Sequence, residues 1–145
     1  MPDIDAAEIF FKQVIGVSRF MRFQDMRAAD VEGTYHGRPG DWVCHIAIGY
    51  AGETQIELVQ HVSGTSLYAD FARDQGFAIQ HVGYVMKEGE LEAAAARLVS
   101  AGYQAIQTAN TRIGRFAYFD TRASIGMVTE LIGLNGVGDE LFRSL

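Results

Sequence analysis

Two short stretches of this chain, Gln55-Ile56-Glu57-Leu58-Val59 and Val128-Thr129-Glu130-Leu131-Ile132, are near copies of each other and carry a glutamate at the same place. Two helical segments, each followed by a glycine, also match: Ile4–Ala7 with Gly16, and Leu91–Ala94 with Gly102. Each half of the chain therefore runs from a helix, through a glycine stop, to strands that end on a glutamate. This internal repeat predicts two copies of one small module.

The composition is that of an ordinary soluble protein with a single domain. Its 145 residues are 48% hydrophobic and 21% charged, with a net charge of -6. The sequence has no basic stripe, so nucleic acid is not expected as a partner. It also has no run of about 20 apolar residues that could span a membrane. Its one cysteine, Cys44, excludes an internal disulfide and lies in an apolar strand, which indicates a core residue in a reducing, cytoplasmic compartment.

Hydrophobic periodicity places the elements of the first half. We expect a helix from about Asp3 to Ile15, with Asp5 and Glu8 as a capping pair and Gly16 as its stop. The strands expected to follow are Val17–Gln24, Ala29–Tyr35, Trp42–Tyr50 and Thr54–Gln60. A short helix over Ser66–Asp74, ending near Gly76, is expected in the connection to the second half.

The second half opens with a strand, Gln80–Met86, before its helix at Gly89–Ala101. The strands expected after that helix are Tyr103–Thr108, Arg115–Asp120 and Met127–Ile132, and the tail Asp139–Leu145 reads as a short helix. The second module is thus βαβββ, whereas the first strand of module one is absent from the chain. We expect one domain over residues 1–145, with module one at 1–62, a connector at 63–79, module two at 80–134 and a tail at 135–145.

With these features the chain resembles the vicinal oxygen chelate superfamily, which includes glyoxalase I, methylmalonyl-CoA epimerase, extradiol dioxygenases and bleomycin-resistance proteins. The segments that carry the resemblance are Pro2–Ala7, Gln55–Val59, His81–Val85, Gly114–Thr121 and Thr129–Ile132. The glyoxalase-like and methylmalonyl-CoA epimerase-like branch is the most similar. The resemblance implies an α+β fold in which paired βαβββ modules form a curved mixed sheet that lines a cleft.

The resemblance also implies a site for a divalent metal ion. Glu57 and Glu130 would be the last-strand ligands of the two modules, and His81 the first-strand ligand of module two. A fourth ligand would lie on the strand that module one lacks. Imidazole and carboxylate together suit Zn²⁺, Ni²⁺, Co²⁺, Mn²⁺ or Fe²⁺, and open coordination positions would serve catalysis.

The function implied is that of a metal-dependent lyase or isomerase of the glyoxalase/epimerase type. It would abstract a proton next to a carbonyl of a small oxygenated or thioester substrate, with Glu130 as the first choice of base and Glu57 as the second. Against this, the two glutamates could lie on solvent-facing sides of their strands, because strands alternate faces.

Two further hypotheses remain open. One is a metal-free binding protein of the bleomycin-resistance type, which would sequester a small hydrophobic ligand among the many aromatic side chains. The other is a degenerate paralogue that only dimerises. A homodimer is expected in every case, because the incomplete first module leaves a strand edge and apolar surface that a second copy could cover.

Overall fold

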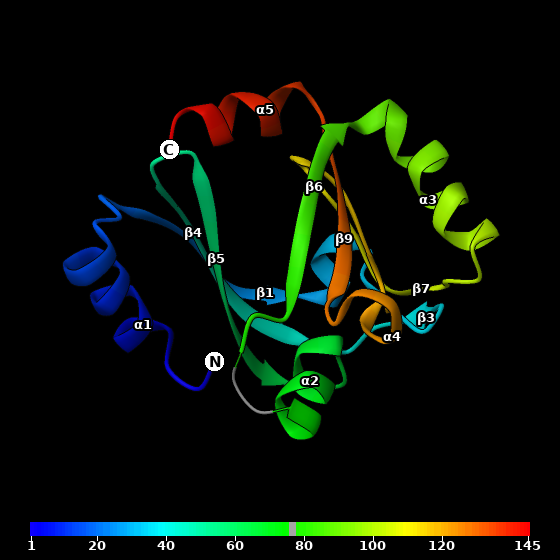
Figure 1. Ribbon diagram of the computed structural model, residues 1–145, viewed down its shortest axis with the longest axis horizontal. Helices are drawn as coiled ribbons and strands as arrows, with labels where there is room; N and C mark the ends of the chain where they lie inside the picture. Colours follow the sequence, from blue (N-terminus) through cyan, green and yellow to red (C-terminus); the bar gives the residue numbers. More distant parts are fainter. Residues whose placement is uncertain (76–77) are drawn as a thin grey trace. The chain divides into compact units, whose positions relative to one another are not determined.

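The computed structural model describes residues 1–75 and 78–145 and divides the chain into two compact units (Figure 1). Unit 1 comprises Met1–Arg27, Asp41–Ala78 and Leu145, and unit 2 comprises Ala28–Gly40 and Ile79–Ser144. None of the helices in the described ranges is long and apolar enough to cross a membrane. The helix stop that the sequence predicts near Gly76 lies outside the described residues.

Unit 1 is a three-stranded antiparallel sheet with the order β1-β4-β5 and two helices. Its elements are α1 (Ile4–Phe10), a π-helical turn (Phe11–Ile15), β1 (Phe20–Arg27), β4 (Val43–Ala51), β5 (Thr54–Ser63) and α2 (Leu67–Gln75). Gly16 ends the first helical segment in the left-handed conformation, with φ of 89°, as the sequence predicts.

Unit 2 is a six-stranded sheet with the order β3-β2-β7-β8-β9-β6, in which only the β6–β9 pair is parallel. Its strands are β2 (Thr34–Tyr35), β3 (Arg38–Pro39), β6 (His81–Lys87), β7 (Ala105–Thr111), β8 (Gly114–Phe119) and β9 (Val128–Leu134). Its helices are α3 (Leu91–Ser100), α4 (Arg122–Ile125) and α5 (Gly136–Arg143), with 3-10 turns at Ala28–Val31 and Glu88–Glu90.

The predicted repeat of modules is confirmed. In unit 1, α1 precedes the three antiparallel strands β1, β4 and β5, and in unit 2, α3 precedes the three antiparallel strands β7, β8 and β9. Only the second module has a strand, β6, before its helix among the described residues. Glu57 and Glu130 therefore lie on the third antiparallel strand of their respective modules, β5 and β9.

The predicted strand Ala29–Tyr35 is wrong. Ala28–Val31 forms a 3-10 turn, and only Thr34 and Tyr35 form a strand, which pairs with β7 in the sheet of unit 2. Glu32 has a φ of 46°, a left-handed conformation that interrupts an extended strand. The branched and aromatic residues around this position are typical of a strand, and their pattern does not reveal the turn at Glu32.

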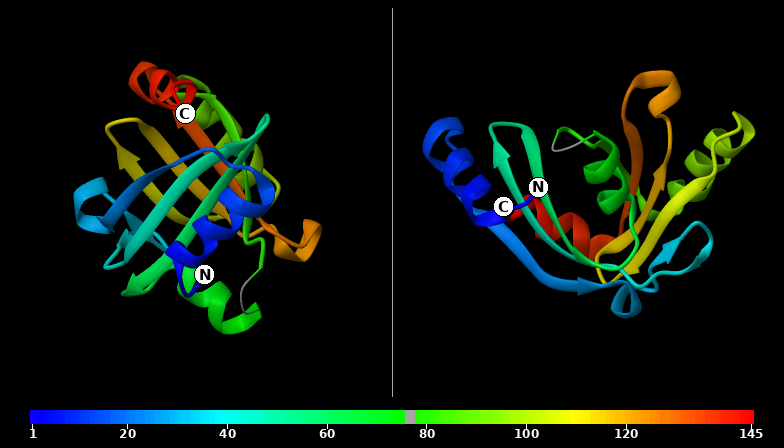
Figure 2. Two further views of the ribbon diagram at one scale, coloured as in Figure 1. Left: turned by 90° about the vertical axis from the view of Figure 1, so that its left-hand side faces the viewer. Right: turned by 90° about the horizontal axis from the view of Figure 1, so that it is seen from below.

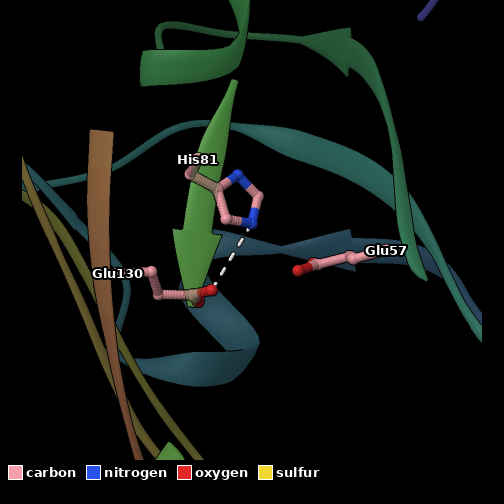
Figure 3. A group of neighbouring side chains, drawn as sticks. All are labelled: Glu57, His81 and Glu130. Carbon is pink, nitrogen blue, oxygen red and sulfur yellow. Dashed lines mark ion pairs between the residues drawn. The ribbon is translucent and has the colours of Figure 1, made fainter. Parts of the chain in front are cut away.

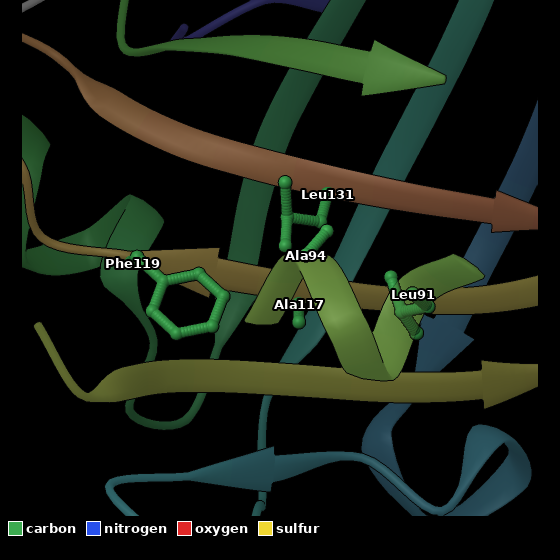
Figure 4. Close-up of a cluster of buried hydrophobic side chains, with 5 residues drawn as sticks. All are labelled: Leu91, Ala94, Ala117, Phe119 and Leu131. Carbon is green, nitrogen blue, oxygen red and sulfur yellow. The ribbon is translucent and has the colours of Figure 1, made fainter. Parts of the chain in front are cut away.

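In each unit a hydrophobic core lies between one helix and one face of the sheet. In unit 2, α3 places Leu91 and Ala94 against Ala117, Phe119 and Leu131 of β8 and β9 (Figure 4). In unit 1, α1 lies along one face of its sheet (Figure 2), where the buried core consists of Ile4, Ala47 and Leu58. Because side chains alternate along a strand, the residues next to Leu58 and Leu131 point to the opposite face of each sheet.

The cap of α1 differs from the predicted Asp5–Glu8 pair. Asp3 is the N-cap, and its Oδ1 accepts hydrogen bonds from the backbone N–H groups of Asp5 and Ala6. Glu8 is instead buried, and it accepts hydrogen bonds from Arg22 Nε at 2.5 Å and Lys12 Nζ at 3.0 Å. Burial by itself raises the pKa of Glu8, whereas the hydrogen bonds and positive charges of Arg22 and Lys12 lower it. Their combined effect is the larger, so the pKa lies below the ordinary value of 4.5.

The substitution Glu8→Gln is expected to lower the free energy of unfolding by about 2 kcal/mol at neutral pH, because it removes two charge-assisted hydrogen bonds. A depressed carboxylate pKa stabilises the fold above the unfolded-state pKa, and this contribution is lost as the pH falls through the folded-state pKa. The difference between parent and variant should therefore shrink between neutral pH and an acidic pH below the lowered folded-state pKa. Urea unfolding of both proteins at the two pH values tests this, with the exposed Glu53→Gln as control; an equal difference at both would exclude the ionic cause.

Candidate functional site

In unit 2, two candidate residues lie on neighbouring parallel strands. His81 is the first residue of β6, and Glu130 is the third residue of β9. The register pairs His81 with Val128 and Gly83 with Glu130. Glu130 follows Thr129 and precedes Leu131, which packs under α3, so its side chain lies on the sheet face away from that helix. The sequence prediction that these residues come from the first and last strands of one module agrees with the structure.

The side chains of His81 and Glu130 face each other. His81 Nε2 lies 3.4 Å from Glu130 Oε2, and the two side chains are 10% and 2% exposed (Figure 3). A carboxylate so thoroughly removed from water needs a compensating positive charge or hydrogen-bond donor nearby. The solvent-facing alternative for Glu130 is therefore wrong.

A hydrogen bond to Gln80 fixes which ring nitrogen of the neutral His81 carries the proton. His81 Nδ1 lies 2.5 Å from Gln80 Oε1, and an amide oxygen can only accept a hydrogen bond, so Nδ1 is the donor. In the neutral imidazole this leaves a lone pair on Nε2, directed at Glu130 Oε2, which is also an acceptor. A proton or a cation at this position turns the repulsion of two lone pairs into attraction. An N–H hydrogen bond from the second ring nitrogen is also the usual way in which a metal-binding histidine is oriented.

The spacing of the two facing atoms fits a shared metal ion. Nitrogen and carboxylate oxygen ligands each lie about 2.1 Å from Zn²⁺, so at a tetrahedral angle they are about 3.4 Å apart. The observed Nε2–Oε2 separation between His81 and Glu130 is 3.4 Å. Both the donor types and their separation therefore match a divalent transition metal.

Tyr118 lies beside the His81–Glu130 pair, although no sequence motif marks it as a site residue. It lies opposite Glu130 in the β8–β9 register and is 5% exposed. Its ring meets the imidazole of His81 edge to face, with centroids 5.5 Å apart and an interplanar angle of 90°. Gln107, 2% exposed, is opposite Tyr118 on β7, so a buried polar row crosses the sheet at Glu130. The alternation of side chains along β8 places Tyr118 on the face opposite Ala117 and Phe119. Only the β8–β9 register shows that this is the face of Glu130.

Glu57 lies on β5 of unit 1, opposite Ile48 of β4, and is half-buried. Its neighbour Leu58 packs in the core beneath α1, so Glu57 points to the sheet face away from that helix. Glu130 has the same relation to α3 in unit 2. The two glutamates that the sequence repeat pairs thus occupy equivalent strand positions and equivalent faces within their own modules.

Cys44 is a core residue, as the sequence predicts. It is 1% exposed, and burial, together with the negative charge of Glu57, raises the pKa of its thiol to about 12. The thiol is therefore protonated at neutral pH and is a poor nucleophile and a poor metal ligand.

The chain is an α+β protein built from two modules, each with one helix followed by three antiparallel strands. In the second module the His81–Glu130 pair lies on the sheet face away from α3. The family model of the Glyoxalase/Bleomycin resistance protein/Dioxygenase superfamily matches residues 1–119. The chain belongs to this superfamily. The resemblance that the sequence shows is confirmed.

Two of the solved structures that match this chain illustrate the shared fold. One is a hypothetical protein from Bacillus halodurans, with a TM-score of 0.67 and 20% sequence identity, covering 93% of this chain and 88% of that chain. The other is methylmalonyl-CoA epimerase from Mycobacterium tuberculosis, with a TM-score of 0.61 and 19% identity, covering 99% of this chain and 86% of that chain. A search of curated proteins finds no significant match. At these identities the structural likeness establishes the fold alone.

Proposed function

We propose that this protein is a metal-dependent lyase or isomerase that moves a proton on the carbon next to a carbonyl group. The observation that carries the proposal is the buried His81–Glu130 pair, whose facing acceptor atoms are 3.4 Å apart and match two ligands of one divalent ion. Methylmalonyl-CoA epimerase, which shares the fold, is named for a reaction on a CoA thioester. A thioester with an acidic α-carbon is accordingly the first substrate class to test.

We further propose Glu57 as the third ligand. Its support is the repeat: Glu57 occupies on β5 the place that Glu130 occupies on β9, and both side chains lie on the face away from the module's helix. Three protein ligands leave coordination positions open for substrate oxygens, as in catalytic metal sites.

The chemistry divides between the ion and the side chains. A divalent ion bound by these residues would stabilise the negative charge that develops on a carbonyl oxygen when the neighbouring carbon loses a proton. Glu130 is the first choice for the base that accepts this proton, which it would do by leaving the ion. Glu57 is the second choice. Gln80 holds His81 in the tautomer that keeps Nε2 directed at Glu130.

Exchange of the α-proton in D₂O tests the reaction class directly. Racemic methylmalonyl-CoA and the hemithioacetal of a 2-oxoaldehyde serve as a thioester and an oxygenated probe, and NMR follows loss of the α-proton signal. We expect exchange of one probe that stops with a chelator, returns with added Co²⁺ and falls at least about 100-fold in Glu130→Gln. The exposed Glu140→Gln is the matched control. Exchange that persists after complete metal removal would refute metal dependence, and no exchange of either probe by the metal-loaded protein would refute the proposed chemistry.

A further inference from the structure

The middle of β6 contains a glycine, Gly83, at the position that faces Glu130 across the parallel β6–β9 pair. Glycine in the interior of a strand is unfavourable, because it adds backbone entropy to the unfolded state and contributes no side chain to packing. Gly83 also does not have a positive φ angle. The backbone conformation at this position therefore suits any residue, and the reason for a glycine must lie in the space around it.

That space is occupied by side chains of β9. A Cβ atom at position 83 would lie 3.0 Å from Glu130 Oε2 and 2.7 Å from Ile132 Cδ1. Carbon and oxygen atoms without a bond between them rarely approach so closely. The Glu130 carboxylate thus extends over the Cα of Gly83, and the same oxygen, Oε2, is the one that faces His81 Nε2.

We propose that Gly83 is a positioning residue, whose missing side chain lets the Glu130 carboxylate lie across β6 and share a metal ion with His81. This inference rests on the proposed metal site and adds a residue that carries no ligand atom. His81 begins β6 and Gly83 follows two residues later on the same face, so one strand supplies both the nitrogen ligand and the space for the oxygen ligand. A methyl group at position 83 would push Oε2 away from His81 without removing any ligand group from the chain.

The two close contacts of the added methyl group separate a positioning role from a packing role. Gly83→Ala introduces both contacts. The double substitution with Ile132→Val removes Cδ1, relieves the 2.7 Å contact and leaves Cγ1 at an ordinary 3.6 Å, while the contact with Glu130 remains. Ile132→Val alone is the matched control, because it removes the same Cδ1 atom while position 83 remains a glycine.

The experiment is calorimetric titration of Co²⁺ into the metal-free parent and the three variants, with urea unfolding of each protein. We expect Gly83→Ala to weaken Co²⁺ binding at least about 10-fold. Adding Ile132→Val should recover stability but not affinity, and Ile132→Val alone should bind like the parent.

Three results would overturn the inference, and each is distinguishable. Parental affinity in Gly83→Ala would show that Glu130 does not need the space. Recovery of affinity in the double variant would show that the glycine serves packing against Ile132. Absence of Co²⁺ binding by the parent itself would refute the proposed metal site, and with it this role of Gly83.

Discussion

Replacing Glu130 with glutamine is expected to weaken Co²⁺ binding at least about 100-fold and to leave the stability of the metal-free protein undiminished. The loss in affinity follows from the removal of a charged ligand atom, Oε2, that faces His81 Nε2. The retained stability follows from burial: Glu130 is 2% exposed, and an amide of the same shape costs less to bury than a carboxylate. An amide N–H can also donate to the lone pair of Nε2, which a carboxylate cannot do.

This combination separates a functional carboxylate from a structural one. If the His81–Glu130 pair existed only to stabilise unit 2, Glu130→Gln would lower the free energy of unfolding and leave metal uptake unaltered. Glu140→Gln, an exposed change of the same charge on α5 of the same unit, is expected to alter neither property. Calorimetric titration with Co²⁺ and urea unfolding at neutral pH measure the two quantities on the same samples.

Phe119→Ala is expected to cost about 3–5 kcal/mol of stability, the largest effect of any single substitution considered for the fold. Phe119 is 1% exposed and packs with Leu91 and Leu131 in the core between α3 and the sheet (Figure 4). Truncation leaves a cavity that β8 and α3 cannot close without moving the sheet. Urea unfolding followed by circular dichroism measures the loss.

The matched control is Phe10→Ala, since Phe10 is 50% exposed at the end of α1, where its ring makes an edge-to-face contact with Phe11. It should cost less than about 1 kcal/mol. Phe119 points to the α3 side of β8, whereas Tyr118 lies on the side of Glu130. Folded Phe119→Ala is therefore expected to bind Co²⁺ as tightly as the parent; equal stability losses for the two phenylalanines would show that the core has been wrongly located.

The residues that the sequence could identify are those repeated between modules. Glu57 and Glu130 stand out because two strand sequences match, and the order of helix and strands around them defines the fold before any coordinates are known. His81 follows from its place at the start of the strand that precedes the second helix. In each case the pattern involves neighbouring or regularly repeated residues, so one sequence is enough to recognise it.

What the sequence could not supply depends on partners that are distant along the chain. The role of Gly83 depends on the β6–β9 register, and the burial of Glu8 depends on Arg22, which lies on β1. The error at Ala29–Tyr35 has the same origin, since the short strand β2 is fixed by pairing with β7 rather than by its own composition. The equivalence of Glu57 and Glu130 could be predicted, whereas the lone pair of His81 that faces Glu130 required the contact with Gln80.

The metal content of the protein tests the central claim, that His81, Glu130 and Glu57 hold one divalent ion. Protein purified without chelators or metal-affinity resin would be examined by elemental analysis, alongside Glu57→Gln, His81→Ala and the control Glu140→Gln. The account predicts about one equivalent of a transition metal per chain in the parent and the control, and a loss of most of it in the two ligand variants. A parent that contains no metal and takes up none on titration, or ligand variants that retain the parental content, would contradict it.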